Sequence, residues 1–197
     1  MPEYAIFILR FSIFTIVHSL FATNIFKRII GKALGREPRP YRLIYNIAST
    51  LIFIWVMSAW RSSPVLYYVP GISSLVMYLA QAILAAMLFT AVRQTGTSSF
   101  LGLKQLGAQA QKQETSHLIT GGWYGVVRHP LYLLSLLFMI LNPVMTAQWL
   151  LLIVLSFFYF MAGAIVEEKR LQLQFGDQYQ KYCRQVPFLI PTFKHRP

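Results

Sequence analysis

Four ionisable side chains stand as two adjacent pairs on either side of an apolar hairpin. Arg128 and His129 come directly before Pro130, and Glu167 and Glu168 follow the second apolar arm. Proline suits the first turn of a helix, so the two bases are expected beside a helix N-terminus, where free N–H groups and the helix dipole attract anions. The hairpin returns the chain to the end where it began, so the bases and the carboxylates should meet there. We call this open end of the hairpin the rim. Such a rim could hold a zwitterion, with the bases on a carboxylate and the glutamates on an ammonium or sulfonium group.

A purely structural interpretation of this rim is also open. Aromatic and basic side chains collect at the edges of the bilayer in membrane proteins. Such a belt accounts for Arg128, Lys169 and Arg170. It accounts for the pair Glu167-Glu168 only if these glutamates merely neutralise the two bases that follow them.

Five apolar stretches are expected to position the rim. A membrane-crossing helix needs about 20 mostly apolar residues, and five segments meet or approach this length: residues 4–23, 43–60, 72–92, 130–144 and 147–166. The fourth is short and ends in Asn142-Pro143, which predicts an early stop and a tight hairpin. After the fifth, Phe175, Tyr179 and Tyr182 recur at helical spacing around Gly176, which predicts an extension of the fifth span followed by an amphipathic helix that packs over the rim.

The predicted fold is therefore an all-α polytopic membrane protein with about five transmembrane helices. We expect one membrane domain over residues 1–197, made of a three-helix scaffold (1–93), a cytoplasmic loop (94–129) and a catalytic hairpin with a cytoplasmic tail (130–197).

Composition supports a membrane protein and excludes other classes. Hydrophobic residues make up 56% of the 197 and charged residues only 12%, where soluble domains have about 45–50% and about 25%. A disordered chain, a disulfide scaffold and an ordinary soluble enzyme are excluded. The net charge of +12 does not favour nucleic acid as a partner, because such binders spread their bases over a soluble face. The single cysteine, Cys183, permits no internal disulfide, and no metal site is expected.

The basic residues predict the orientation. Sixteen of the 18 fall in three segments on one side of the expected spans: Lys27, Arg28, Lys32, Arg36, Arg39, Arg42; Arg93, Lys104, Lys112, Arg128; Lys169, Arg170, Lys181, Arg184, Lys194, Arg196. The positive-inside rule then puts the N-terminus outside and the C-terminus in the cytoplasm. We expect an integral protein of a bacterial inner membrane, in contact with membrane lipids, whose site faces the cytoplasm.

Two ionisable residues fall inside the first span. Arg10 and His18 are functional candidates because charged groups inside a membrane are costly. The alternatives are that Arg10 reaches outward to the interface and that His18 bonds to another helix. Gln81, in the third span, is expected to join two helices.

The motif around these pairs resembles that of a known family of membrane enzymes. The isoprenylcysteine carboxyl methyltransferase superfamily, which includes phospholipid methyltransferases, has a similar ordered set of residues across a hairpin. In this chain the set is Gly122, Tyr124, Arg128, His129, Pro130, Tyr132, Glu167, Glu168, Leu171, Phe175, Gly176, Tyr179, Tyr182, Val186, Pro187, Ile190 and Pro191. The N-terminal half is similar to the bacterial methanethiol S-methyltransferase branch, through His18-Ser19-Leu20 and residues 41–45 among others.

The resemblance implies methyl transfer from S-adenosylmethionine to a small thiol or a lipid-like acceptor, a cysteine carboxylate or an amine. By this analogy the catalytic residues are Arg128, His129, Glu167 and Glu168. The cofactor residues are His117, Leu118, Ile119, Gly122, Tyr124, His129, Pro130, Tyr132, Glu167 and Tyr179. The acceptor residues are His18, Arg170 and Tyr182. In this scheme the two bases hold the cofactor's carboxylate and the glutamates its ammonium, and His18 or a tyrosine is a candidate base.

One departure from the family pattern concerns the acceptor. Many members have glycine where this chain has Leu134, which is expected to narrow the acceptor entrance. Two other functions stay open from the sequence. One is a non-enzymatic assembly or haem-handling factor with His18 as the axial ligand, and the other is a membrane reductase that uses a nicotinamide cofactor.

Overall fold

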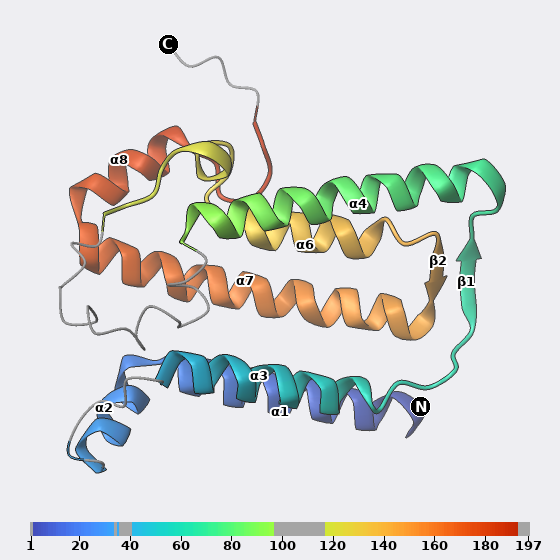
Figure 1. Ribbon diagram of the computed structural model, residues 1–197, viewed down its shortest axis with the longest axis horizontal. Coiled ribbons are helices and arrows are strands. Elements are labelled where there is room, and N and C mark those ends of the chain that lie inside the picture. The colour runs from blue at the N-terminus through green and yellow to red at the C-terminus, as the bar shows by residue number, and fades with distance from the viewer. Residues whose placement is uncertain (1, 34, 36–40, 97–116, 193–197) are drawn as a thin grey trace. The chain divides into compact units, whose positions relative to one another are not determined.

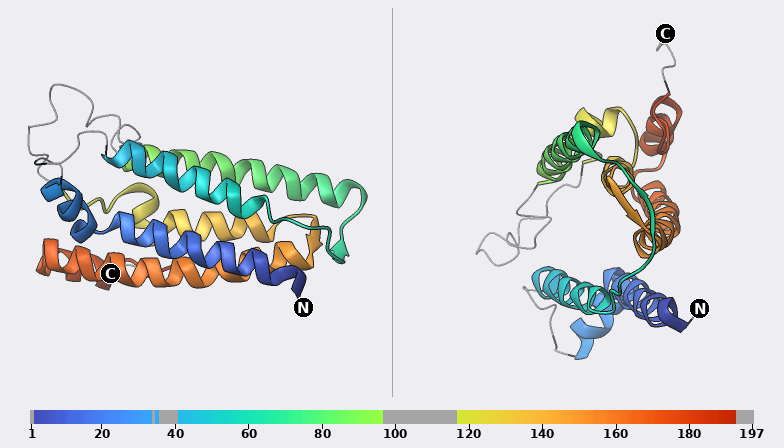
Figure 2. Two further views of the ribbon diagram at one scale, coloured as in Figure 1. Left: turned by 90° about the horizontal axis from the view of Figure 1, so that it is seen from below. Right: turned by 90° about the vertical axis from the view of Figure 1, so that its right-hand side faces the viewer.

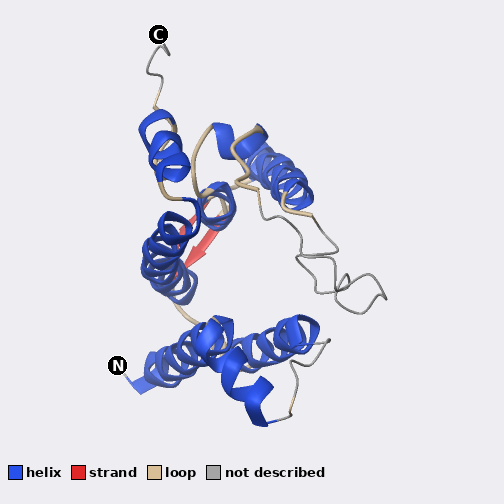
Figure 3. Cartoon of the chain, turned by 90° about the vertical axis from the view of Figure 1, so that its left-hand side faces the viewer, coloured by secondary structure: helices blue, strands red, loops and turns tan. Residues whose placement is uncertain are grey.

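The described part of the chain is mostly helical, with one small sheet (Figure 3). A computed structural model describes residues 2–33, 35, 41–96 and 117–192. Arg36, Arg39, Lys104, Lys112, Lys194 and Arg196, six of the bases that predicted the orientation, lie outside these residues. Two compact units are present, one containing helices α1 to α3 and the other the elements from β1 onward. The division of the chain into scaffold, loop and catalytic hairpin stays a prediction.

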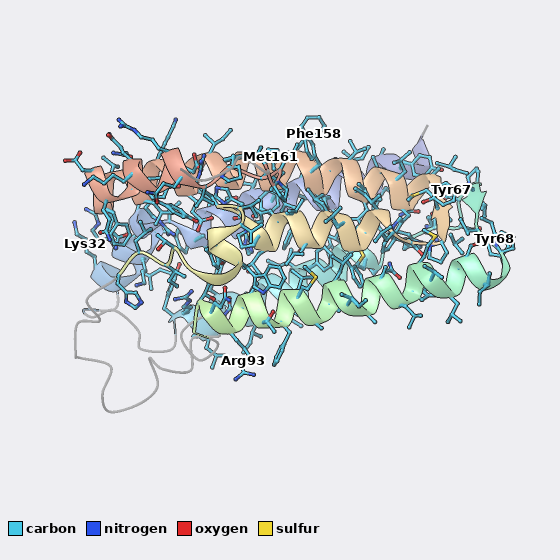
Figure 4. All side chains as sticks on the ribbon, turned by 90° about the horizontal axis from the view of Figure 1, so that it is seen from above. Lys32, Tyr67, Tyr68, Arg93, Phe158 and Met161 are labelled. Atoms are coloured by element: carbon cyan, nitrogen blue, oxygen red, sulfur yellow. The ribbon has the colours of Figure 1, made fainter. Side chains whose placement is uncertain are left out.

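All five predicted apolar stretches form helices. Three are long and apolar enough to cross a membrane, and they lie in α1 (Pro2–Ala22), α4 (Gly71–Gln94) and α7 (Ala147–Phe175). Two are shorter, α3 (Tyr41–Met57) and α6 (Pro130–Ile140). Large apolar side chains point outward from them, as Phe158 does from α7 in Figure 4. Such surfaces suit contact with lipid rather than with water.

In the first unit, α1 and α3 run side by side (Figure 1). Arg10 donates from Nη1 to the carbonyl of Trp55 at 2.9 Å and to the hydroxyl of Ser58 at 2.7 Å, and its guanidinium lies 4.7 Å from the Trp55 ring centroid. These partners belong to the C-terminal end of α3, where a cation is favoured by the helix dipole. Arg10 thus stabilises the end of a neighbouring helix.

The first unit also contains a helix that the sequence analysis did not predict. It is α2 (Asn24–Ala33), which begins two residues after α1 ends. The sequence analysis used its basic residues to predict the orientation and did not examine them for a helical period.

In the second unit, α4, α6 and α7 run side by side (Figures 1 and 2). The sequence analysis missed a short antiparallel sheet at one end, where β1 (Val65–Tyr68) pairs with β2 (Val144–Thr146) in the register Tyr67 to Met145. Both strands lie between helices, and an exposed four-residue strand carries no periodic burial signal. The expected all-α class is therefore corrected to a mostly helical fold with one two-stranded sheet.

The contact between α4 and α6 decides where Leu134 lies. Leu134 is buried in a cluster with Leu84 and Ala91 of α4, so it does not narrow an entrance at the rim, as the sequence analysis had expected. Gln81 donates to the carbonyl of Phe138 at 2.9 Å, which confirms its predicted role between two helices. α6 begins at Pro130 and ends at Ile140, so the predicted early stop is confirmed.

The hairpin continues into a long helix and a cap. Thr146 accepts a hydrogen bond from the backbone N–H of Trp149 and so caps the start of α7. α7 continues past the apolar span that ends at residue 166, which confirms the predicted extension, and stops at Gly176, whose φ of +52° favours glycine. α8 (Asp177–Gln185) then packs through Tyr179 and Tyr182, which confirms the predicted cap helix.

Candidate active site

Arg128 joins three parts of the second unit. Its Nε donates to Glu168 Oε1 at 2.6 Å, and its Nη1 donates to the carbonyls of Cys183 and Val186 at 3.2 and 2.8 Å. Its backbone N–H also donates to the carbonyl of Pro187. The side chain is only 12% exposed. Burial opposes the charge of Arg128, but the hydrogen bond and charge of Glu168 outweigh it and raise the arginine pKa. Arg128 therefore fastens the cap to α7, and only its Nη2 makes no hydrogen bond to a described residue.

His129 lies between the two glutamates. Its Nε2 is 3.3 Å from Glu168 Oε1, and its Nδ1 is 3.8 Å from Glu167 Oε2. The side chain is 4% exposed. Burial lowers the pKa of the imidazole, Arg128 adds to this effect, and the two carboxylates partly oppose it. A neutral ring has one N–H to donate, so His129 is suited to orienting a carboxylate.

The two glutamates have different surroundings. Glu168 is held by Arg128, whereas Glu167 receives one hydrogen bond at 3.2 Å, from the hydroxyl of Tyr132, and is 38% exposed. The Tyr132 ring stacks between His129 and Phe160, with centroids 5.5 and 5.2 Å away. This stack fixes the hydroxyl beside Glu167 and leaves the carboxylate with spare capacity to accept hydrogen bonds.

A cavity of about 260 Å³ opens on this side of α7. It brings together nine of the residues predicted from the sequence: His117, Leu118, Ile119, Tyr124, Arg128, His129, Glu167, Tyr179 and Tyr182. They come from the segment before the 3₁₀ helix η2 (Gly122–Gly125), from η2 itself, from the rim of α6 and from α7 and α8. Glu168 instead faces a larger groove of about 540 Å³ between α7 and α8, which shares Tyr179 with the cavity.

Raised pKa values keep three tyrosines of the cavity protonated, so they can donate hydrogen bonds but are poor bases. Burial and the charge of Glu167 raise the pKa of Tyr124 to about 12. Burial likewise raises the pKa of Tyr179, with Glu168 adding to it, and that of Tyr182, where Arg128 opposes it. Tyr182 donates to the carbonyl of Tyr124 at 2.7 Å.

The hydroxyl of Tyr179 is an exception in a closely packed site. The residue is 2% exposed, and its oxygen has no hydrogen-bond partner among the described residues. The thiol of Cys183, a weak acceptor, is near enough to affect its pKa. A buried hydroxyl without a partner is costly, and here it borders both hollows.

Comparison with known proteins agrees with this arrangement. A family model described as phospholipid methyltransferase matches residues 69–178, over half of the chain and nearly all of the second unit up to the start of α8. The chain belongs to the phospholipid methyltransferase family. It is therefore a methyltransferase and, with its long apolar helices, an integral membrane protein. The non-enzymatic and reductase functions left open by the sequence are set aside.

The chain is also similar to individual curated proteins over most of its length. Methanethiol S-methyltransferase 2 of Bradyrhizobium diazoefficiens is 31% identical over 187 residues, covering 93% of this chain and 71% of that protein. The methanethiol S-methyltransferase of Crocosphaera subtropica is 31% identical over 192 residues, covering 91% and 71%. No solved structure matches the chain.

Some residues that the resemblance implied lie away from the cavity in this family member. Gly122 has a φ of +59° and packs so closely on Gln94 that a side chain would collide with it. Its place in the motif is therefore explained by the turn. Pro130 and Tyr132 are next to His129 but line neither the cavity nor the groove. Arg170 is exposed on α7 and also lines neither of them. His18 belongs to the first unit, where it bonds to Ser49 and Tyr45.

The sequence analysis assigned no role to some other residues beside the candidate site. Leu171, which the motif already contained, and Gln174 line the cavity one and two turns after Glu167, and this helical spacing could have identified both as lining residues. Phe188 packs its edge against His129 with centroids 4.9 Å apart and lies 5.5 Å from the Arg128 guanidinium. No spacing links Phe188 to the rim, because the chain returns there only after α8.

Proposed function

We propose that this enzyme transfers a methyl group from S-adenosylmethionine to a small thiol. The observation that carries the proposal is the set of unused polar groups around the cavity: Nη2 of Arg128, the open side of Glu167 and the hydroxyl of Tyr179. They combine donors, a carboxylate and a neutral hydroxyl, as a ligand with both an anionic and a cationic group requires.

The donor set fits the amino-acid part of this cofactor. Glu167 would accept from its ammonium, and Nη2 of Arg128 would donate to its carboxylate. His129 would orient Glu168 and so hold Arg128 in place. Residues 117–119, with Tyr124, would line the adenosine portion. This modifies the scheme drawn from the resemblance, because Arg128 and Glu168 act as a joined pair and Glu167 alone takes the ammonium.

The cofactor supplies an electrophilic methyl group on a sulfonium, and the chain aligns the reactants and excludes water. Alignment of this kind can contribute about 7–11 kcal/mol to lowering a barrier. α8 covers the cavity through Tyr179 and Tyr182, and raised pKa values keep the cavity tyrosines protonated as donors. The proton of a thiol acceptor must leave by another group.

The proposed placement has five membrane-crossing helices, with the N-terminus outside and the site facing the cytoplasm of a bacterial inner membrane. Glu167 lies 20 residues after Ala147, where α7 begins, and this corresponds to about 30 Å of helix, the thickness of the apolar core. Arg93 lies at the rim end of α4, and Tyr67 and Tyr68 lie at the opposite end of the unit (Figure 4). This polarity supports a cytoplasmic rim under the positive-inside rule.

The acceptor class rests on the relatives. The two described above are named for methanethiol. A lipid-like acceptor, a cysteine carboxylate or an amine, is the second candidate, favoured by the exposed apolar helices beside the rim.

The test is calorimetric titration of the purified full chain in detergent with S-adenosylmethionine, followed by transfer of labelled methyl to a panel of acceptors. We expect binding, and label on methanethiol but not on prenylated cysteine or phosphatidylethanolamine. No heat of binding would overturn the cofactor assignment. Label on a lipid with none on thiols would overturn the acceptor alone.

A further inference from the structure

α2 has two separate faces along its ten residues. At 100° per residue, Ile25, Ile29, Phe26 and Ile30 fall on one side, and all three basic residues of the helix fall on the other: Lys27, Arg28 and Lys32. The helix contains no acidic residue. Its composition is that of helices that lie in the plane of a membrane surface.

The first unit holds α2 at the end of α1. The backbone N–H of Phe26 donates to the hydroxyl of Thr23 at 3.2 Å, so Thr23 caps the helix. The Phe21 and Phe26 rings stack with centroids 4.5 Å apart, and Tyr41 donates to the carbonyl of Phe21 at 2.6 Å. Figures 1 and 2 show α2 turning away from the axis of α1 and α3. The bend between the membrane-crossing helix α1 and α2 is therefore held by specific contacts.

Half of the apolar face of α2 is exposed in the described part of the chain. Ile25 is 66% exposed and Ile29 is 57% exposed, and Arg28 and Lys32 are exposed on the other side. Water would leave the isoleucines of this face unburied. A bilayer covers both, because acyl chains meet the isoleucines while lipid phosphates meet the bases.

We propose that α2 is a binding site for anionic phospholipid at the membrane surface where α1 ends. Apolar insertion keeps the helix in the interface, and Lys27, Arg28 and Lys32 enrich negatively charged lipid around it. This site lies in the first unit and does not depend on the proposed function.

The chain has a single cysteine, Cys183, so a fluorophore can be attached at one chosen position once this cysteine is replaced. Cys183→Ser removes it, and Ile29→Cys supplies a site for an environment-sensitive fluorophore on the apolar face. The full chain is placed in vesicles of 70% phosphatidylcholine and 30% phosphatidylglycerol, with brominated acyl chains, which quench the fluorophore, on either one lipid or the other.

Per mole, brominated phosphatidylglycerol should quench at least about threefold better than brominated phosphatidylcholine, because each base near the surface favours anionic lipid severalfold. Adding Arg28→Gln with Lys32→Gln should bring the ratio close to one. The matched control Lys181→Gln with Arg184→Gln, two exposed bases of α8, should leave it unchanged. In the parent protein, 0.5 M salt should also reduce the ratio.

Equal quenching by the two lipids in the parent protein would overturn anionic selectivity. Absence of quenching by either lipid would overturn membrane contact by α2 and point to another partner. An equal loss in the control variant would show that total charge, rather than α2, attracts the lipid. The salt titration uses no charge variant, so it decides the matter even if a substituted protein does not fold.

Discussion

The protein contains two arginine–histidine pairs in largely apolar surroundings, and they differ in what satisfies them. Between α1 and α3, Arg10 bonds to a carbonyl and a hydroxyl, and His18 bonds to the hydroxyls of Ser49 and Tyr45, at 2.9 and 2.7 Å. At the rim, Arg128 and His129 face two carboxylates and a cavity.

This difference distinguishes a pair that joins two helices, Arg10 and His18, from a pair that lines a candidate binding site, Arg128 and His129. The partners of Arg10 and His18 named above are neutral groups on α3 or directly after its end, and they join α1 to α3. The rim pair is linked to three elements and leaves a carboxylate and a hydroxyl with spare hydrogen-bonding capacity. An ionisable residue in a membrane helix thus indicates a site only when it borders unused polar groups and space.

The largest expected effect is on stability, from Arg128→Ala. Removing the guanidinium leaves Glu168 without its main partner and two cap carbonyls unpaired, which should cost about 3 kcal/mol or more. Thermal unfolding in detergent measures this, with Arg10→Ala as the matched control, expected to cost about 1 kcal/mol. If the two variants were equally destabilised, the comparison between the pairs would fail.

The next effect separates the two glutamates. Glu167→Gln should weaken binding of S-adenosylmethionine by about 10- to 100-fold, the value of a charge-assisted hydrogen bond, with little change in stability. Glu168→Gln should mainly lower the melting temperature, because it breaks the bond to Arg128. Calorimetry measures cofactor affinity and thermal unfolding measures stability, and both are applied to both variants. Loss of stability in Glu167→Gln and loss of cofactor affinity in Glu168→Gln would mean that the two roles are exchanged.

A smaller effect is expected at His18. His18→Phe removes the hydrogen bonds to Ser49 and Tyr45, and such bonds between membrane helices contribute about 0.6 kcal/mol on average. Cofactor affinity should stay within twofold of the parent protein. A tenfold loss of cofactor affinity would break the comparison by making His18 part of the rim site. The KM for the acceptor tests the role in acceptor binding that the resemblance implied.

The smallest expected effect is a pH dependence due to His129. Burial lowers its pKa in the folded chain, so below about pH 6.5 the unfolded chain binds a proton that the folded chain does not. Stability should therefore fall as the pH decreases from 7 towards 5. Thermal unfolding of the parent protein and of His129→Gln isolates this contribution, which should be absent from the variant. A parent protein that gains stability relative to the variant on acidification would contradict the lowered pKa.

Sequence reasoning identified most of the residues that line the cavity, and much of the fold, for definable reasons. Apolar length predicted the five helices, and proline and glycine predicted where α6 begins and α7 ends. The sheet was missed because both strands are short, β1 is exposed, and their pairing joins segments about 80 residues apart. Phe188 escaped because its contacts depend on the return of the chain after α8.

The sequence by itself determined that bases and carboxylates meet at one rim, because helix length and a tight hairpin leave few other arrangements. It could not determine which of the two glutamates forms the ion pair with Arg128. Glu167 and Glu168 are adjacent and chemically identical, but they project about 100° apart around α7. Only the tertiary structure decided that Glu168 holds Arg128 and the cap while Glu167 faces the cavity, because that choice depends on where α6 and α8 pack around the helix.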